Sequence, residues 1–138
     1  MTPFTNSYII TARGLPSSTY YLNIAPLPDN ELWFYTALGQ YEPDASKYRP
    51  VSPAASQTPP PGFLDALTTD LNVAIANGCP QLTVIIHGLG NLFTDAVAEM
   101  TTLGSGLQQY ASYYGLVISF DWPSYGALDS SLFCNSFS

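Results

Sequence analysis

The feature that most constrains the fold is a pair of short apolar segments with one amphipathic segment between them. Residues 81–86 (QLTVII) and 116–120 (LVISF) have the length and β-branched content of strands buried on both faces. Across residues 93–110, apolar side chains recur at helical spacing, and Gly115 is a typical stop. The order strand, helix, strand predicts a βαβ unit with two parallel strands.

The N-terminal part of the chain has the pattern of an antiparallel meander. Residues 7–13, 19–25 and 32–38 are rich in β-branched and aromatic residues, and turn-forming residues separate them. Residues 50–62 (PVSPAASQTPPPG) form a Pro/Ser-rich connector, which we expect to run extended over the surface without marking a domain boundary. Residues 63–77 favour a helix, because their leucines recur at helical spacing and an Asn-Gly stop signal follows.

These segments predict one domain over residues 1–138, a reduced three-layer α/β domain. Its mixed sheet is expected to have an antiparallel N-terminal meander and a parallel βαβ end. The sequence Gly104-Ser105-Gly106 falls inside the second helical segment, where each glycine costs about 1 kcal/mol relative to alanine. We expect a kink or a break of the helix there.

The charge balance excludes several kinds of partner. Lys and Arg total 3 against 10 Asp and Glu, which gives a net charge of −7. Arg13, Lys47 and Arg49 form no cluster that could bind a nucleic-acid backbone or an anionic membrane surface. The apolar runs are far shorter than the roughly 20 residues of a membrane span. The N-terminus also lacks the basic start and apolar stretch of a signal peptide, so the compartment stays open.

Neither a metal ion nor a cofactor is expected. The chain has a single histidine, which makes a structural zinc site improbable. Its two cysteines, Cys79 and Cys134, do not make a disulfide framework, and their spacing does not decide whether they pair.

The groups best suited to chemistry follow the two predicted parallel strands. The carboxyl ends of such strands meet at one edge of the sheet, where ligands bind. His87 follows the first strand and Asp121 follows the second. Gly88 and Gly90 come next to His87, and glycine allows the close backbone approach that oxyanion stabilisation by N–H groups needs. A strand-to-helix turn that requires small residues explains the same glycines.

The pair HG followed by FDWPSYG, within about residues 80–128, resembles the strand-end motifs of α/β-hydrolases. The similar branch has motifs that read HG and then WPS-x-G. The resemblance implies a serine-hydrolase fold that acts on carboxylic esters or related acyl compounds. It also implies that His87 and Gly88 open the oxyanion loop, that the N–H of Leu89 is one donor, and that Trp122 shapes the loop beside the site. In lipase-like members the histidine orients the loop and is not the base.

The chain departs from that family at the nucleophile. It contains no G-x-S-x-G elbow, and the acid and histidine that follow the nucleophile in the fold are missing too. Ser105, between its two glycines, is a poor substitute because it falls inside a helical pattern. Three interpretations stay open: a truncated chain without activity, a minimal hydrolase with a rebuilt site, and a non-catalytic binding or assembly module that keeps half of the hydrolase fold.

A rebuilt site would have to use His87 as its base, with a pKa near neutrality. Asp121 would orient the imidazole. The nucleophile would be Ser124, in the accessible loop, or Ser119, which shares a strand face with Asp121. Each of these residues also has a plain structural interpretation, as a loop-orienting histidine, a capping aspartate or turn serines.

The expected edge of the sheet bears on assembly. In α/β-hydrolases the strand that ends in HG, which we call the HG strand and which corresponds here to residues 81–86, has two neighbours. One is the strand that precedes WPS-x-G, and the other, on its far side, is the strand that carries the nucleophile. With that neighbour missing, residues 84–86 are expected at an open apolar edge, which invites pairing with another chain. We therefore expect a homo-oligomer, in the first place a dimer, joined by strand pairing or by an apolar sheet face.

Overall fold

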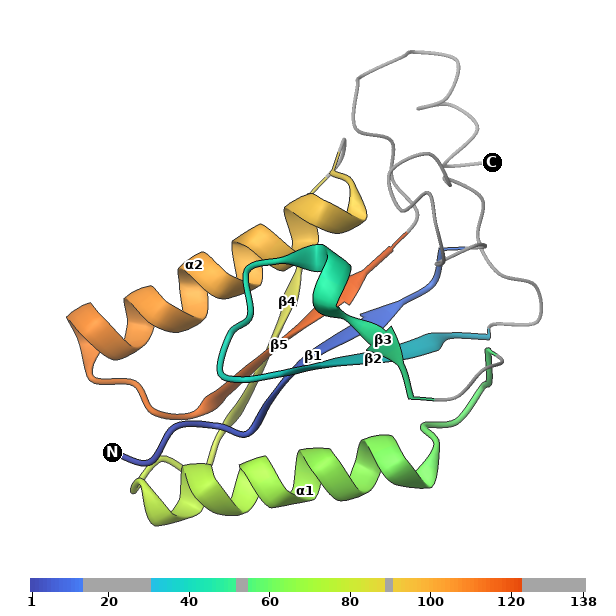
Figure 1. Ribbon diagram of the computed structural model, residues 1–138. Helices are drawn as coiled ribbons and strands as arrows, with labels where there is room; N and C mark the ends of the chain where they lie inside the picture. The colour runs from blue at the N-terminus through green and yellow to red at the C-terminus, as the bar shows by residue number, and fades with distance from the viewer. Residues whose placement is uncertain (14–30, 52–54, 89–90, 123–138) are drawn as a thin grey trace.

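The computed structural model describes residues 1–13, 31–51, 55–88 and 91–122. They form a mixed α/β fold, a five-stranded sheet with two α-helices packed on it (Figure 1). In their order across the sheet, the strands are β3 (Arg49–Pro50), β2 (Trp33–Leu38), β1 (Asn6–Thr11), β5 (Leu116–Asp121) and β4 (Leu82–Ile86). The helices are α1 (Pro61–Ala76), α2 (Phe93–Ala111) and the short 3-10 helix η2 (Ala45–Lys47).

The strand directions confirm a mixed sheet with antiparallel pairing of the N-terminal strands and a parallel βαβ unit. The strands β1, β2 and β3 pair antiparallel as a meander, whereas β5 runs parallel to both β1 and β4. The helix α2 connects β4 to β5, which completes the βαβ unit. Because β1 pairs directly with β2, the third strand of this meander is β3, and the strand expected at residues 19–25 lies outside the described residues.

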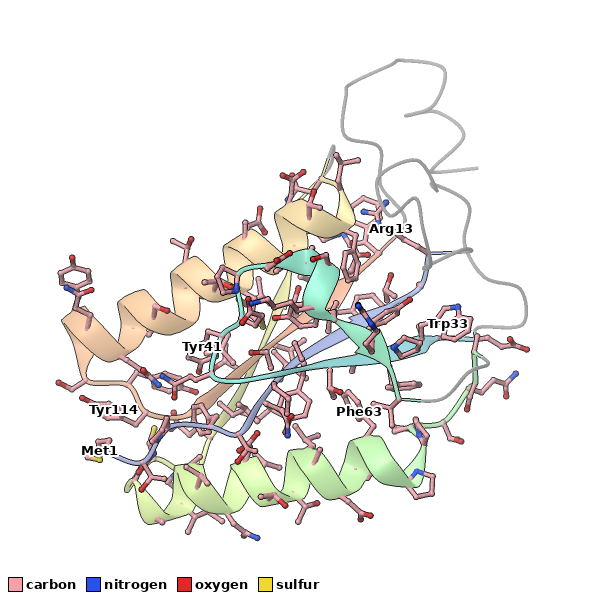
Figure 2. All side chains as sticks on the ribbon, in the orientation of Figure 1. Met1, Arg13, Trp33, Tyr41, Phe63 and Tyr114 are labelled. Atoms are coloured by element: carbon pink, nitrogen blue, oxygen red, sulfur yellow. The ribbon has the colours of Figure 1, made fainter. Side chains whose placement is uncertain are left out.

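Adjacent residues of β2 show which helix covers which face of the sheet. The ring of Phe34 contacts Phe63 of α1 at a centroid distance of 5.1 Å, whereas Tyr35 contacts Phe93 of α2 at 5.7 Å. Successive side chains of a strand point to opposite faces, so α1 and α2 pack on opposite faces. Figure 2 shows Phe63 projecting from α1 toward the sheet.

A buried carboxylate ties α1 to the start of β1. Asp70 of α1 accepts hydrogen bonds from the backbone N–H groups of Thr5 (2.7 Å) and Asn6 (3.0 Å) and from the hydroxyl of Tyr8 (2.6 Å). Burial, together with the adjacent carboxylate, raises the pKa of the Tyr8 hydroxyl, so it stays protonated and keeps donating. The sequence patterns did not predict this contact.

The predicted connector and first helix are largely as expected. The helix α1 begins two residues before the predicted start, at Pro61, because the first helical position tolerates proline. It ends at the predicted Asn-Gly signal, where Gly78 has a φ of +83°. Within the connector at residues 50–62, Ser56 exchanges backbone hydrogen bonds with Leu32, which fixes one point of the connector beside β2.

The prediction that residues 81–86 are buried on both faces is wrong. The strand β4 lies at the edge of the described sheet, where Leu82, Val84 and Ile86 are 42%, 50% and 67% exposed. The helix α1 packs mainly on β1, β2 and β5, so it leaves this face of β4 uncovered. The buried parallel strand is β5, one position further in.

The expected break at Gly104-Ser105-Gly106 does not occur, because α2 is one continuous helix. Gly104 is buried where the ring of Tyr41 packs against the helix, and a Cβ atom there would lie 2.7 Å from Cζ of that ring. The glycine therefore permits a close approach that any side chain would block. Gly106 has no such neighbour.

Replacement of Gly104 by alanine should destabilise the protein by about 1–3 kcal/mol, because the new methyl group overpacks the Tyr41 ring. Gly106→Ala is the matched control in the same helix. It should be neutral or stabilise by up to about 1 kcal/mol, through helix propensity alone. Urea unfolding measures both, and an equal effect of the two substitutions would contradict the close packing at Gly104.

Candidate functional site

Three parallel strands deliver their carboxyl ends to one edge of the sheet. Thr11 ends β1, Asp121 ends β5, and His87 directly follows β4. The register places Thr11 beside Asp121, and alternation along the strands directs all three side chains to the α2 face. The sequence rule that brought His87 and Asp121 to the same edge is therefore confirmed by the structure.

The carboxylate of Asp121 is the centre of this edge. It is fully buried and accepts hydrogen bonds from Arg13 Nε (2.7 Å) and Nη2 (3.0 Å), from Thr11 Oγ1 (2.7 Å) and from His87 Nε2 (2.7 Å). The Arg13 guanidinium engages both carboxylate oxygens, which is the strong bidentate form of this ion pair. Figure 2 shows Arg13 close to the start of α2.

Opposing effects set the pKa of Asp121. Burial penalises the charged carboxylate and would raise its pKa, but the hydrogen bonds from His87 and Arg13 and the charge of Arg13 outweigh burial and lower it. Asp121 is therefore ionised throughout the neutral range. An ionised carboxylate at this depth depends on its donors, because an unpaired buried charge is strongly destabilising.

His87 uses both ring nitrogens as donors. Nε2 lies 2.7 Å from Oδ1 of Asp121, and Nδ1 lies 2.8 Å from the carbonyl oxygen of Gly88. Both partners can only accept, so the contacts favour the doubly protonated imidazolium. Burial by itself would lower the pKa of His87, but the bonds to Asp121 and Gly88 outweigh it and raise the pKa above the ordinary value. In this arrangement the imidazole has no free nitrogen to accept a proton.

The cluster of Arg13, His87 and Asp121 combines two cationic groups with one carboxylate. With His87 protonated, its net charge is positive, although the whole chain carries −7. All three side chains are buried, where charges interact more strongly than in water. The cluster can therefore favour negative charge on a group held close to it.

Trp122 joins the segment after β5 to the segment after β4. Its indole N–H donates to the carbonyl oxygen of His87 at 2.6 Å, and its ring stacks on the imidazole with centroids 5.4 Å apart and planes at 13°. A flat aromatic face against a cationic imidazole is a favourable arrangement. The position of His87 is thus fixed from both sides, by Asp121 in the plane of the ring and by Trp122 on its face.

The start of α2 is tied to the same cluster. Arg13 Nη2 donates to the carbonyl oxygen of Asn91 at 2.8 Å, and the side-chain amide of Asn91 donates to Glu99 at 2.6 Å. The side chain of Asp95 accepts from the backbone N–H of Leu92 at 2.8 Å, which caps the helix. Arg13 therefore links the ends of β1 and β5 to the helix that follows β4.

The remaining predicted site residues divide into two groups. Gly88 is described and supplies the carbonyl acceptor for His87, whereas Leu89, Gly90 and Ser124 lie outside the described residues. Ser119 is buried on β5, and its hydroxyl has no hydrogen-bond partner within the described part of the chain. Pairing of Cys79 with Cys134 is not tested, because Cys134 is also outside that part.

Sequence reasoning missed Arg13, which it treated only as one of three scattered basic residues. The residue lies 108 positions from Asp121, and the two meet because β1 is a parallel neighbour of β5. A usable signal was present: Arg13 is the last residue of a predicted strand, in a chain with three basic residues. A buried carboxylate after a neighbouring strand needs such a partner.

The described ranges contain no group of three or more His, Cys, Asp or Glu side chains that could hold a metal ion. None of the helices in those ranges is long and apolar enough to cross a membrane. Comparison with known proteins gives no match: no family model fits the sequence, and no curated protein or solved structure is similar to the chain.

Asp121→Asn should lower the free energy of unfolding at neutral pH by about 3–5 kcal/mol, because it removes the negative charge that Asp121 places against the buried Arg13 guanidinium. Asp65→Asn, at an exposed position of α1, is the control and should change stability by less than about 0.5 kcal/mol. Both values come from urea unfolding. A small effect of the Asp121 substitution would show that the ion pair is not essential to the fold.

The raised pKa of His87 makes stability depend on pH in a defined direction. A group with a higher pKa in the folded state stabilises fully below its unfolded pKa, here about 6.5, and loses that contribution as pH rises through the folded pKa. The wild type should therefore lose stability relative to His87→Gln as the pH rises above about 6.5. Parallel unfolding curves of the two proteins across that range would refute the assignment.

Proposed function

We propose that this chain is an α/β-hydrolase-type hydrolase of reduced fold that acts on carboxylic esters or related acyl compounds where β4 and β5 end. The observation that carries the proposal is the 2.7 Å hydrogen bond between His87 and Asp121. It joins the end of the HG strand to the end of the strand that precedes WPS-x-G. The bond from Trp122 to the His87 carbonyl joins the same two segments again. The resemblance to α/β-hydrolases assigns these segments to the oxyanion side of the site.

The strand order also supports this proposal. The strand β5 lies between β1 and β4, so the HG strand and the WPS strand are neighbours. In α/β-hydrolases the same two strands pair, and the strand that carries the nucleophile lies on the far side of the HG strand. On that far side, β4 has no partner among the described strands.

Transition-state stabilisation is the chemistry that the cluster favours. Acyl transfer develops negative charge on the carbonyl oxygen, and fixed N–H donors near positive charge stabilise it in a water-poor site. With His87 protonated, the cluster of Arg13, His87 and Asp121 supplies net positive charge directly before the loop that begins at Gly88. We assign the backbone N–H groups of Gly88, Leu89 and Gly90 to this role.

The contacts favour a positioning role for His87 and Asp121 over the roles of base and acid. A base role requires Nδ1 of His87 to leave the Gly88 carbonyl and to lose its proton, and both partners oppose this. We retain Ser124, three residues after Asp121, as the candidate nucleophile. Its hydroxyl would attack the ester carbonyl and lose its proton to solvent water, the alcohol would leave, and a second water would hydrolyse the acyl-serine. Without a complete triad, oxyanion stabilisation and binding give roughly 10³–10⁴-fold acceleration over water.

A second candidate function is a non-catalytic binding or assembly module. The observation that favours it is the open edge of β4, where alternate apolar side chains are exposed. Such an edge supports pairing with another chain, and on this interpretation the chain forms a homo-oligomer, in the first place a dimer.

Hydrolysis of p-nitrophenyl acetate and p-nitrophenyl butyrate tests the first proposal. The wild type should hydrolyse both esters faster than buffer, and Ser124→Ala should lose at least about 100-fold if Ser124 is the nucleophile. His87→Gln, which can still donate to Asp121, should retain activity within about tenfold and keep the pH profile of the wild type. Ser105→Ala, at an exposed position of α2, is the control and should leave turnover unchanged.

The outcomes separate the roles. A loss of about 10²–10⁴-fold in His87→Gln, with a changed pH profile, would assign His87 as the general base. Full activity of Ser124→Ala would remove that serine from the mechanism. Absence of turnover in the wild type would overturn the hydrolase proposal and leave the assembly module.

A further inference from the structure

The backbone of β4 has an open hydrogen-bonding edge. The carbonyl of Gln81 accepts from the N–H of Leu116 at 2.9 Å, so the polar groups of Gln81 face β5. Backbone polar groups alternate in direction along a strand, so those of Thr83 and Ile85 also face β5. Those of Leu82, Val84 and Ile86, by the same alternation, point away from the sheet. Among the described strands, none pairs with this side of β4.

The same alternate residues expose apolar side chains. Leu82, Val84 and Ile86 lie on the face that α1 leaves uncovered, and their exposed fractions rise from 42% to 67% along the strand. Natural edge strands are usually protected by lysine, proline or a bulge. The strand β4 has none of these, because its sequence is LTVII and it pairs in continuous register with β5. Open backbone groups and exposed apolar side chains thus coincide on one strand.

Charge indicates what can cover this edge. The chain carries −7, so most surfaces of a second copy would repel it. The strand β4 contains no charged residue, and two copies can meet there without placing carboxylates against each other. The strand also has no carboxylate that could form an ion pair with a basic partner, so charge gives such a partner no advantage. A neutral apolar strand is the complement of this edge, and β4 of a second copy is such a strand.

We propose that a second copy of the chain pairs with β4 in antiparallel orientation about a two-fold axis at Val84. In this register Val84 lies opposite Val84 of the partner subunit, and Leu82 lies opposite Ile86 of the partner subunit. These are the residues with outward-facing backbone groups, so each opposed pair exchanges hydrogen bonds in the antiparallel pattern. Their side chains form apolar cross-strand pairs on the exposed face. The interface is isologous, and it joins the two sheets into one continuous sheet.

A groove on the other face of β4 extends the contact. Ile85 and the α2 residues Leu103 and Leu107 line an open, mainly apolar groove of about 590 Å³ between β4 and α2. Its lining also includes Glu99 of α2, whose carboxylate accepts a hydrogen bond from the side-chain amide of Asn91. Pairing of a short strand alone falls below the roughly 1,200 Å² that a stable interface buries. Antiparallel pairing brings the grooves of the two copies to the same seam, where their apolar walls add to the buried area.

Sedimentation velocity of the full chain at micromolar concentration tests this interface. The wild type should sediment as a dimer. Val84→Lys and Val84→Asp should each weaken dimerisation by at least about tenfold, because the two-fold axis opposes like charges. An equimolar mixture of the two variants should restore the dimer, because opposite charges then meet at the axis. Leu64→Lys, at an exposed apolar position of α1, is the control and should remain dimeric.

Each other outcome contradicts the proposal in a specific way. A monomeric wild type overturns the dimer, and if the outward-facing amides of Leu82, Val84 and Ile86 also resist hydrogen exchange, the edge is covered by residues of the same chain. A dimer that persists in both Val84 variants, with circular dichroism unchanged, places the interface elsewhere. Equal weakness of the mixture and of the single variants rules out this register. Ester hydrolysis does not enter these measurements, so the interface and the hydrolase proposal can fail separately.

Discussion

The carboxylate of Asp121 is the interaction on which the rest of the site depends. Removing an ionised carboxylate from water costs several kcal/mol unless donors replace the water. Here the donors come from the end of β1, from Arg13 just beyond it and from His87 after β4, so three strand ends must meet for the charge to be tolerated. Arg13 extends the requirement to the start of α2 through the Asn91 carbonyl. The Asp121 carboxylate can therefore stay buried and ionised only if these strand ends are assembled as they are in this fold.

Both ring nitrogens of His87 already have hydrogen-bond partners in that network, and this decides whether His87 can act as a base. In a catalytic triad, an acid orients a histidine whose second nitrogen is free to exchange a proton with the nucleophile. The second nitrogen of His87 is held by the carbonyl of Gly88, and Arg13 already balances the charge of Asp121. The geometry is that of a rigid support with residual positive charge, beside a loop of small residues. A buried network whose groups are all hydrogen-bonded holds one arrangement. Such rigidity favours the positioning of backbone N–H groups, and it disfavours proton transfer by His87.

The site could be predicted only in part from sequence, for a different reason at each residue or strand. His87 and Asp121 were brought together correctly, because both follow parallel strands and that rule needs backbone topology alone. Arg13 was missed because the predicted meander gave its strand no parallel neighbour, whereas β1 lies between β2 and β5. The prediction that β4 is buried on both faces was wrong, because a short apolar run does not show whether helices cover both faces of the strand. Gly104 was taken as a helix breaker, because the Tyr41 ring that requires it comes from a distant segment.

The sequence by itself determined the local elements of this protein. Helical spacing, alternating β-branched residues and Asn-Gly signals depend on near neighbours, and they predicted α1, α2, β4, β5 and the parallel unit that the last three form. Tertiary structure alone decided that β1 lies beside β5, that one face of β4 is left uncovered, and that Arg13 is the cation that meets the buried carboxylate. Those outcomes depend on contacts between residues as many as 110 positions apart. The free energy of such contacts comes from burial and charge pairing, and neither is encoded in the spacing of neighbouring residues.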